Sequence, residues 1–469
     1  MKNKFKFRVC DNRTLTVSFL FVLLSTLTLV GCDDFVDVDL PSSQLPSEAV
    51  FEDNTTATAA MVSIYAQMRT NGLLNGNPDG MTYKLGEYAD EMTFYGVSQP
   101  SDTSFPDNTV LPTNAIIQRW WNASYSQIYA ANAVLEGVAN STALTAAQKD
   151  QLRGEALFAR ALLHFYLVNL YGAIPYIETT DYRANSTVSR MPVPTVYEHL
   201  TADLLAAREL LATDYITIDR VRPNKATVEA LLARVYLYNG QWAAAADMAS
   251  AVLNNADLYA WETDLDLIFK KESTATIWHL MPASDGVNTN EAGAHIFLEG
   301  PPPVSSLAVN LVDAFEAGDN RRTKWIRAVT DGAETWYHAY KYQAIDNTGS
   351  SVEYSIMFRT AELYLIRAEA RARQGELTNA KEDLDLIRTT AGLGNTAATT
   401  QDEILAAIEK ERRVELFTEG HRFFDLKRTA RLDAVLDSKT GWEATDQLLP
   451  LPEAELLLNP NLNPQNTGY

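Results

Sequence analysis

The amino-acid sequence predicts a mostly α-helical protein: a single globule with long irregular loops and a few short β-strands. Apolar residues recur at the spacing of one helix face over long stretches on both sides of the middle of the chain. Two segments, 226–253 and 361–388, carry small residues and a glycine at matching positions. Two others, 71–112 and 258–354, are rich in Gly and Pro and contain only short β-like runs, which favours loops.

Residues 1–31 have the layout of a secretory signal peptide. Basic side chains precede an apolar run that is short for a membrane span and contains several Ser and Thr residues. The sequence from Leu29 to Cys32 is Leu-Val-Gly-Cys, which resembles the bacterial lipobox. In a lipobox the cysteine receives a diacylglycerol anchor and becomes the first mature residue. We therefore expect Cys32 to be lipidated.

Residues 32–52 read as an acidic tether with Pro41 and Pro46, which separates the globule from its lipid. Its acidic start resembles the signal that sends lipoproteins to the cell surface in the Bacteroidetes. The only other cysteine, Cys10, lies in the leader, so the mature chain can form no internal disulfide. Stability must therefore come from burial of apolar surface.

Four helices are predicted in the N-terminal part of the globule, over residues 54–68, 114–138, 146–170 and 197–211. The first can begin at Asn54 or Thr55, and both residue types cap helix N-termini well. The third ends at Gly172, and Pro175 just beyond it is a stop signal.

The segments 226–253 and 361–388 each have the spacing of a tetratricopeptide helix pair. A small residue lets the two helices approach closely, and a glycine ends the first helix in a left-handed conformation. The matching positions are Ala233 with Ala368, Gly240 with Gly375, and Ala245 with Ala380. The copies are not in tandem, so no regular solenoid is expected. Residues 147–211 read as a distorted further copy, and 403–436 as the last long helical stretch.

Aromatic residues in the Gly- and Pro-rich segments have less reason to be buried than those on helix faces. Flat rings suit sugars, because a pyranose presents C–H groups to the ring face, and such stacking adds roughly 1 kcal/mol per pair beyond burial. We therefore predict a ligand site shared by the segments 71–112 and 258–354. Its candidate residues are Tyr95, Phe105, Trp278 and Trp336. Membership of the core remains an open alternative for each of them.

Charge and motifs exclude several classes of function. The formal net charge of −21 makes the chain a poor candidate for binding nucleic acid or anionic headgroups. No two of the six His stand at a metal-ligand spacing on one helix, and nucleotide-binding and nucleophile motifs are absent from the sequence. We expect no catalytic residues, no cofactor and no metal site. A carboxylate pair of the glycosidase type stays open, because carboxylates are plentiful.

The charged stretch 409–428 invites a functional reading, but a structural one is better. Its apolar residues supply core contacts, and its alternating charges can pair across helix turns. On this interpretation His421 is a packed or solvated residue rather than a ligand.

Four features together resemble the SusD/RagB family of Bacteroidetes outer-membrane nutrient-binding lipoproteins. They are the lipobox with its acidic continuation, residues 153–175 (Arg-Gly-Glu-Ala-Leu-Phe-Ala-Arg-Ala to Leu-Tyr-Gly-Ala-Ile-Pro), the stretch from Arg359 to 428, and the tail 449–469. The resemblance covers nearly the whole mature chain. It implies a SusD-like domain over 53–469, built on about four tetratricopeptide-like helix pairs. Within it we expect a helical part (53–257), a loop-rich ligand-face insertion (258–354), and a helical C-terminal part with the tail (355–469).

The resemblance also implies a function. Such a protein would face the cell exterior, be held to the outer membrane by its lipid alone, and pack against a SusC-like, TonB-dependent transporter. Its loops would capture an oligosaccharide or polysaccharide. Two alternatives remain: a family member that binds peptides or glycoproteins, and a purely structural tetratricopeptide scaffold lipoprotein. Ligand residues differ between relatives, so the family motifs assign none here.

Overall fold

The structure of the protein is a computed structural model that describes residues 47–96 and 103–469. The chain divides into two units, 1–49 and 50–469, and the fold described below is that of the second unit. The short helix α2 (Ser47–Val50) lies at the boundary. The expected signal peptide, Cys32 and most of the tether fall outside the described residues.

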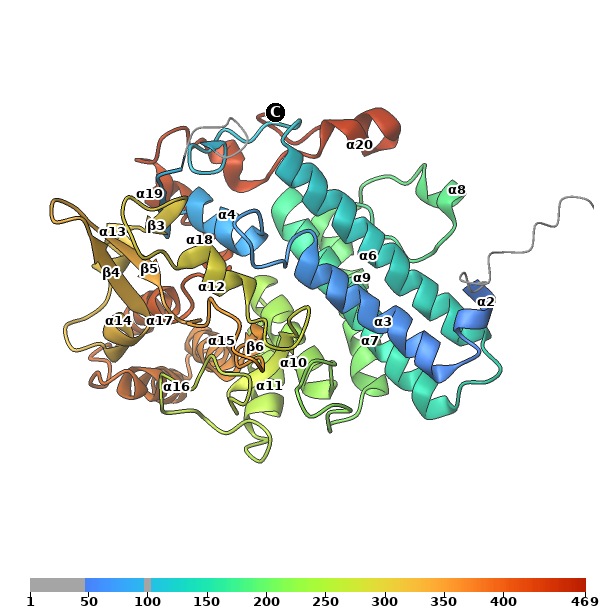
Figure 1. The fold of residues 1–469 in the computed structure, drawn as a ribbon, viewed down its shortest axis with the longest axis horizontal. Coiled ribbons are helices and arrows are strands. Elements are labelled where there is room, and N and C mark those ends of the chain that lie inside the picture. The colour runs from blue at the N-terminus through green and yellow to red at the C-terminus, as the bar shows by residue number, and fades with distance from the viewer. Residues whose placement is uncertain (1–46, 97–102) are drawn as a thin grey trace, which may run out of the picture. The chain divides into compact units, whose positions relative to one another are not determined.

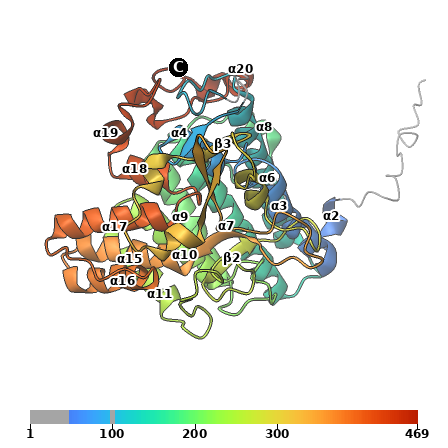
Figure 2. The same cartoon turned by 60° about the vertical axis from the view of Figure 1, so that its left-hand side comes forward.

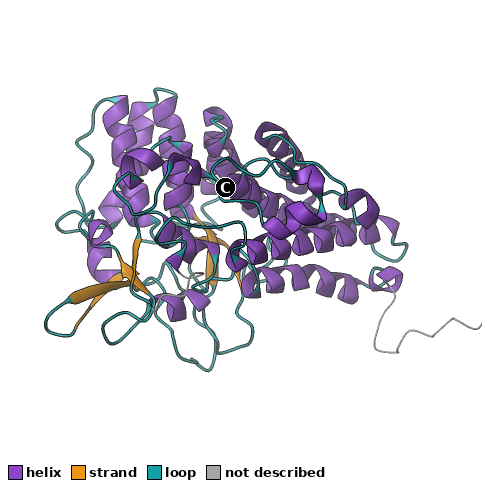
Figure 3. Cartoon of the chain, turned by 90° about the horizontal axis from the view of Figure 1, so that it is seen from above, coloured by secondary structure: helices purple, strands orange, loops and turns teal. Residues whose placement is uncertain are grey.

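Helices dominate the unit, as the sequence predicts (Figures 1 and 3). The N-terminal half contains α3 (Asn54–Thr70), α6 (Ala115–Asn140), α7 (Ala146–Tyr171) and α9 (Val193–Leu210). Helix α7 packs between α6 and α9, and α3 packs on α6. All four predicted helices are confirmed, with ends shifted by a few residues. Asp53 caps α3 by accepting from the backbone N–H groups of Thr55 and Thr56.

The two related segments form helix pairs that stack on each other. The first pair is α10 (Lys225–Tyr238) with α11 (Trp242–Leu253), and the second is α15 (Thr360–Arg373) with α16 (Leu377–Thr390). Helix α11 packs against α15, and α17 (Gln401–Glu415) packs on α15 in turn (Figure 2). Gly240 and Gly375 have positive φ values of 69° and 84°, as expected for residues that end the first helix of a pair.

Small, fully buried alanines let the helices of these pairs meet closely. Ala233 and Ala368 have no exposed surface, and neither do Ala245 and Ala380. One apolar cluster fills the space between the N-terminal helices and the first pair, and a smaller cluster lies among α15, α16 and α17. The predicted close approach at these positions is therefore confirmed.

The region between the two helix pairs contains short β-strands, one of which pairs with β1 (Met92–Phe94) from the N-terminal half. Three two-stranded antiparallel sheets pair β1 with β3 (Ser305–Leu307), β2 (Thr276–Leu280) with β6 (Ser355–Arg359), and β4 (Ile326–Thr330) with β5 (Thr335–Ala339). The short helices of this region are α12 (Asn290–His295), α13 (Val309–Val312) and α14 (Asn320–Lys324). The two β-like runs of the sequence, Thr276–His279 and Trp336–Gln343, fall on β2 and β5, although β5 ends at Ala339.

The segment 71–112 is less irregular than its composition suggests. It contains β1 and also α4 (Met81–Tyr88), in which every residue except Thr82 is buried. The expectation of loops with only short β-like runs is therefore wrong for residues 81–88, although β1 is a run of that kind. Gly80 caps the N-terminus of α4, and a glycine in this segment suggests a turn. A helix of eight residues also shows too little periodicity to be recognised from the sequence.

The last helical stretch is also broken where the sequence predicts continuity. After α17 the chain forms α18 (Arg422–Arg428) and α19 (Leu432–Leu436), and ends with η3 (Ala444–Gln447), α20 (Glu453–Leu458) and η4 (Pro460–Leu462). Thr418, Gly420 and Ala430 have left-handed backbone conformations, with φ values of 59°, 80° and 56°, and these end the helices.

Charges of the 409–428 stretch are structural, but their partners are distant in sequence. Arg321 forms ion pairs with Glu411 and Glu415, and Arg359 bonds to Glu415 and Glu419. The expected pairing across helix turns is therefore only a minor part of the arrangement. His421 is buried, and desolvation lowers its pKa to about 4, so it is neutral at physiological pH. In the part of the chain that the structure describes, no helix is long and apolar enough to cross a membrane.

Candidate functional site

Two of the four predicted ligand residues meet on the surface formed by the loops. The ring centroids of Tyr95 and Trp336 lie 6.4 Å apart, with the ring planes at 88°, so the edge of one ring meets the face of the other. Tyr95 is 43% exposed, whereas Trp336 is only 5% exposed. The pair thus presents one accessible ring, that of Tyr95, supported from the side by a buried one.

Backbone hydrogen bonds hold Tyr95 in this position. Strand β1 ends at Phe94, and the N–H groups of Tyr95 and Gly96 both donate to the carbonyl of Val304, at 2.7 and 3.0 Å. Val304 directly precedes β3, so the two bonds extend the β1–β3 pairing. The ring is therefore attached to a paired strand end, which reduces the ordering cost of binding.

Trp336 is positioned by the β4–β5 hairpin, in which it lies opposite Val329. Gly300 lies against its ring, at a distance that leaves no room for a side chain. This close contact contributes to the low exposure of the indole. Trp336 is consequently a support for Tyr95 rather than a second platform.

The structure places the other two predicted residues in the core. Phe105 is completely buried and contacts Tyr88 and Trp120, with ring centroids 5.9 and 5.4 Å away. Trp278 is also completely buried, between Tyr65 and Phe158, and its indole N–H donates to the carbonyl of Val221. Neither ring offers a face to a ligand, so both are omitted from the candidate site.

A small hollow of about 320 Å³ lies between α12 and the loops that precede α4 and follow β5. Amide, hydroxyl and carboxylate groups make up about half of its lining, and Pro78, Val287 and Ile345 are among the other residues. The polar lining residues are Asn77, Asn288, Thr289, Asn290, Asp346 and Asn347. Sequence analysis missed these residues, because Asn and Asp in loops are indistinguishable from ordinary turn residues.

Several of these amides have structural roles that fix the hollow. Asn288 donates to the carbonyl of Asp346 and accepts from the N–H groups of Val352 and Glu353. Asn290 donates to the carbonyl of Asn75 over 2.6 Å, which ties α12 to the loop after α3. The hollow is therefore built on a network of hydrogen bonds and does not depend on a ligand to form.

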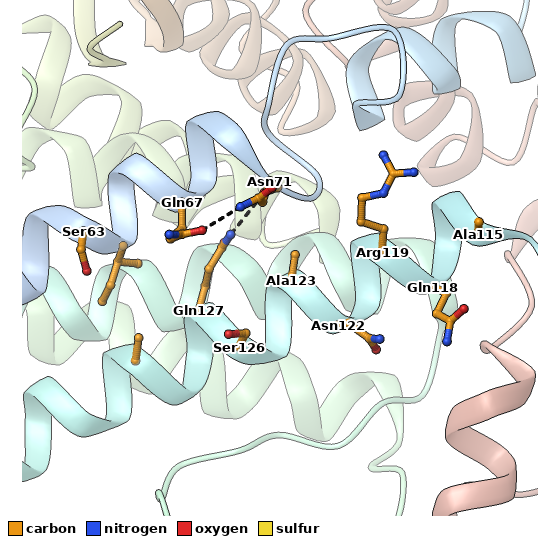
Figure 4. A pocket seen from close by; sticks show the side chains of 12 residues that line it. Ser63, Gln67, Asn71, Ala115, Gln118, Arg119, Asn122, Ala123, Ser126 and Gln127 are labelled. Atoms are coloured by element: carbon orange, nitrogen blue, oxygen red, sulfur yellow. Dashed lines mark hydrogen bonds between the residues drawn. The ribbon is translucent and has the colours of Figure 1, made fainter. Parts of the chain in front are cut away.

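A larger groove of about 570 Å³ runs between α3 and α6 and begins at the same loop after α3 (Figure 4). Asn71 donates to Gln67, and Gln127 donates to the backbone carbonyl of Asn71. Gln118, Asn122 and Ser126 also line the groove, and Arg119 is its only charged residue. These positions lie on the polar faces of two amphipathic helices, and periodicity does not distinguish a polar face that binds ligand from one that faces water.

Burial shifts the pKa values of three ionisable groups beneath the loops toward their neutral forms. Burial lowers the pKa of His295 to about 3 and also lowers that of His338. Burial raises the pKa of Glu291, whose carboxylate accepts from Ser355 at 2.7 Å. Within the described ranges, no three His, Cys, Asp or Glu residues are grouped as a metal site. This arrangement favours recognition of an uncharged, hydroxyl-bearing ligand through a ring face and amides.

Comparison with known proteins gives two family matches. Residues 34–237 match the SusD-like family described as starch-binding and associating with the outer membrane, and residues 312–469 match the SusD family. Among curated proteins, SusD-like protein P2 of Formosa agariphila is 27% identical over 97% of this chain and 99% of its own length.

Solved structures with the same fold include a SusD superfamily protein from Bacteroides vulgatus. It has a TM-score of 0.76 and 20% identity, and the match covers 89% of this chain and all of that one. A laminarin-binding SusD-like protein has a TM-score of 0.75 and 24% identity, and the match covers 88% of this chain and 99% of that one. At these identities the likeness concerns the fold.

Proposed function

Because the chain belongs to the SusD/RagB family, we propose that it binds an oligosaccharide or polysaccharide at the cell surface and delivers it to a TonB-dependent outer-membrane transporter. In this proposal Cys32 carries the lipid that anchors the protein, and residues 32–52 form the tether. The family description that mentions the outer membrane supports the location.

The observation that carries the proposal is the exposed ring of Tyr95, fixed against Trp336. A sugar ring laid on Tyr95 would contact it through C–H groups, which adds about 1 kcal/mol beyond area burial. The chain positions this ring through the hydrogen bonds to Val304, so little flexibility is lost on binding.

Amides in two depressions of the described surface favour a neutral sugar over a charged ligand. Asn77 and Asn347 line the hollow beside α12, and Gln67 and Asn71 line the groove between α3 and α6. Arg clusters of the kind that hold phosphate or carboxylate are not among the lining residues of either depression.

The relatives of this protein suggest which polysaccharides to test first. Laminarin is the ligand in the name of one structural relative, and starch appears in the description of the matching family. Purified protein lacking the leader should be retarded by at least one of several neutral polysaccharides in an affinity gel. Tyr95→Ala should weaken that retardation. Leu111→Ala, at another exposed position, is the matched control and should bind normally.

The same experiment tests the alternatives. A structural scaffold would bind none of the polysaccharides, and a peptide-binding relative would bind a protein digest instead. A reducing-sugar assay on the bound polysaccharide should detect no new chain ends, since we propose binding without hydrolysis. Release of reducing sugar by the pure protein would contradict that part of the proposal.

A further inference from the structure

A second groove lies on the other side of α6 from α3. Its volume is about 560 Å³, and its walls come from α6, the segment around α8 (Tyr182–Asn185), and α20 with the turn that follows it. Figure 1 shows α8 and α20 beside α6, away from α3. We propose that this groove is a second saccharide-binding site, an inference that rests on the proposed function.

Three tyrosines give the groove its aromatic surface. Tyr125 forms the floor, where its hydroxyl donates to the carbonyl of Pro175 at 2.9 Å and its ring packs on Trp121 with centroids 4.9 Å apart. Tyr129 is 51% exposed and Tyr182 is 70% exposed. Tyr125 and Tyr129 stand four residues apart on α6, so they share one face of that helix.

The three tyrosine rings do not stack on one another. Tyr125 makes ring contacts with Trp121 and His164, and no contact between any two of the three tyrosine rings occurs among the described residues. Rings that do not stack on one another can each take a separate sugar unit, as an extended chain requires.

Polar groups with free hydrogen-bonding capacity also line the groove. Within the described residues, neither the carboxylate of Glu455 nor the amide of Asn122 makes a hydrogen bond, although both line the groove. Asn185 uses its NH₂ group to donate to the carbonyl of Thr179, so its own side-chain oxygen remains available. Sugar hydroxyls can donate to these oxygens and accept from the amide of Asn122.

Glu455 argues against an apolar protein segment as the occupant. It is half-buried, and desolvation already raises the pKa of its carboxyl group. An apolar surface laid over it would bury the carboxylate without a partner, which is unfavourable. Carboxylates are accordingly depleted at the centres of protein interfaces. A saccharide would supply hydroxyl donors at that position and apolar C–H faces for the tyrosines.

The test is a titration of short, single-length oligosaccharides, with laminarihexaose and maltohexaose as the probes. The variants are Tyr95→Ala, the double variant Tyr129→Ala/Tyr182→Ala, and Glu455→Gln. Leu457→Ala is the matched control, because Leu457 is exposed on α20 but does not line the groove. All the altered side chains are at least partly exposed, so unchanged thermal midpoints should confirm folding.

We expect two binding events for the wild type with at least one probe. Tyr95→Ala should remove one event and leave the other. The double variant and Glu455→Gln should each weaken the remaining event at least tenfold, and Leu457→Ala should change nothing. If Tyr95→Ala abolishes all binding, or the groove variants bind as the wild type does, the second site is disproved and the proposed function stands. A wild type that binds neither these probes nor the polysaccharides contradicts the proposed function itself.

Discussion

Arg234 on α10 and Glu362 on α15 form a buried ion pair with two hydrogen bonds, at 2.6 and 2.7 Å. Their side chains are 4% and 2% exposed. Arg234 also donates to the hydroxyl of Tyr166 on α7, and its guanidinium lies 4.5 Å from the centre of the Phe358 ring. One side chain thus joins α7, β6 and the first helices of the two related pairs, which lie far apart in the sequence.

Replacing Arg234 with Met should lower the free energy of unfolding by about 3–5 kcal/mol, because Glu362 would remain as an unpaired buried charge. Urea denaturation at pH 7 measures the change. Lys324→Met is the control, since Lys324 pairs with Asp266 at the surface, where both side chains are nearly half exposed. That variant should cost less than about 1 kcal/mol. Equal losses of unfolding free energy for the two variants would show that the buried pair stabilises the fold no more than a surface pair does.

Sequence patterns predicted the helical frame well, because helix signals are local. The apolar face of α3, the glycines Gly240 and Gly375, and the small residues Ala233 and Ala368 all depend on neighbours within one or two turns. The breaks at Thr418 and Ala430 could not be predicted, since neither residue type favours a left-handed backbone and tertiary contacts impose it.

The candidate site was predicted only in part, because ring exposure depends on tertiary packing. Tyr95 and Phe105 lie in the same Gly- and Pro-rich segment, yet one ring is exposed and the other is enclosed by Tyr88 and Trp120. No local pattern separates them. The amides of the α3–α6 groove were missed for a related reason: polar residues on an amphipathic helix have the same periodicity whether they bind ligand or water.

Trp278→Ala should behave as a core substitution, in contrast to Tyr95→Ala. The first should lower the free energy of unfolding by roughly 3–5 kcal/mol, because it leaves a cavity among Tyr65, Phe158 and Phe358. Tyr95→Ala should leave the thermal midpoint nearly unchanged and weaken saccharide binding by about 1–3 kcal/mol. Thermal unfolding and calorimetric titration of both proteins provide the comparison. If the Trp278→Ala variant is as stable as the wild type but binds saccharide more weakly, Trp278 is a ligand-binding residue after all.

Glu419 should contribute to stability above pH 4.5 and lose that contribution in acid. Burial alone would raise the pKa of its carboxyl group, but Arg359 and Lys341 outweigh burial and lower it to about 2. A carboxyl group whose pKa is lower in the folded state stabilises the fold above its ordinary pKa, by about 3 kcal/mol for a shift of this size. That stabilisation disappears as the pH falls from about 4.5 to about 2.

Urea unfolding at a series of pH values tests this, with Glu419→Gln beside the wild type. The variant should be less stable at pH 7, and the difference should shrink as the pH falls below 4.5. Between pH 6.5 and 4.5 both proteins should lose stability in parallel, because burial lowers the pKa of His164 to about 3 and protonation then favours the unfolded chain. A constant difference across the whole range would show that Glu419 is not held ionised by its neighbours.

Cys32→Ala should release the protein from the membrane fraction, since the proposed lipid on Cys32 is the anchor. The prediction rests on the lipobox that follows a short apolar leader. Fractionation followed by a high-salt wash is the measurement, and Cys10→Ala, within the leader, is the matched control that should stay with membranes. If the Cys32→Ala protein is processed but still pellets after the wash, another anchor holds it.

Saccharide binding should be weak and nearly independent of salt. A dissociation constant from micromolar to millimolar corresponds to roughly −8 to −4 kcal/mol. Neutral sugars make no ion pairs, so the affinity measured at low and at physiological ionic strength should agree within error.

Arg119→Gln is the control variant, because Arg119 is the one charged residue that lines the α3–α6 groove. Its affinity should depend on salt as little as that of the wild type does. A steep loss of affinity as salt rises would indicate a charged ligand, and the net charge of −21 would then favour a cationic one, such as a basic peptide.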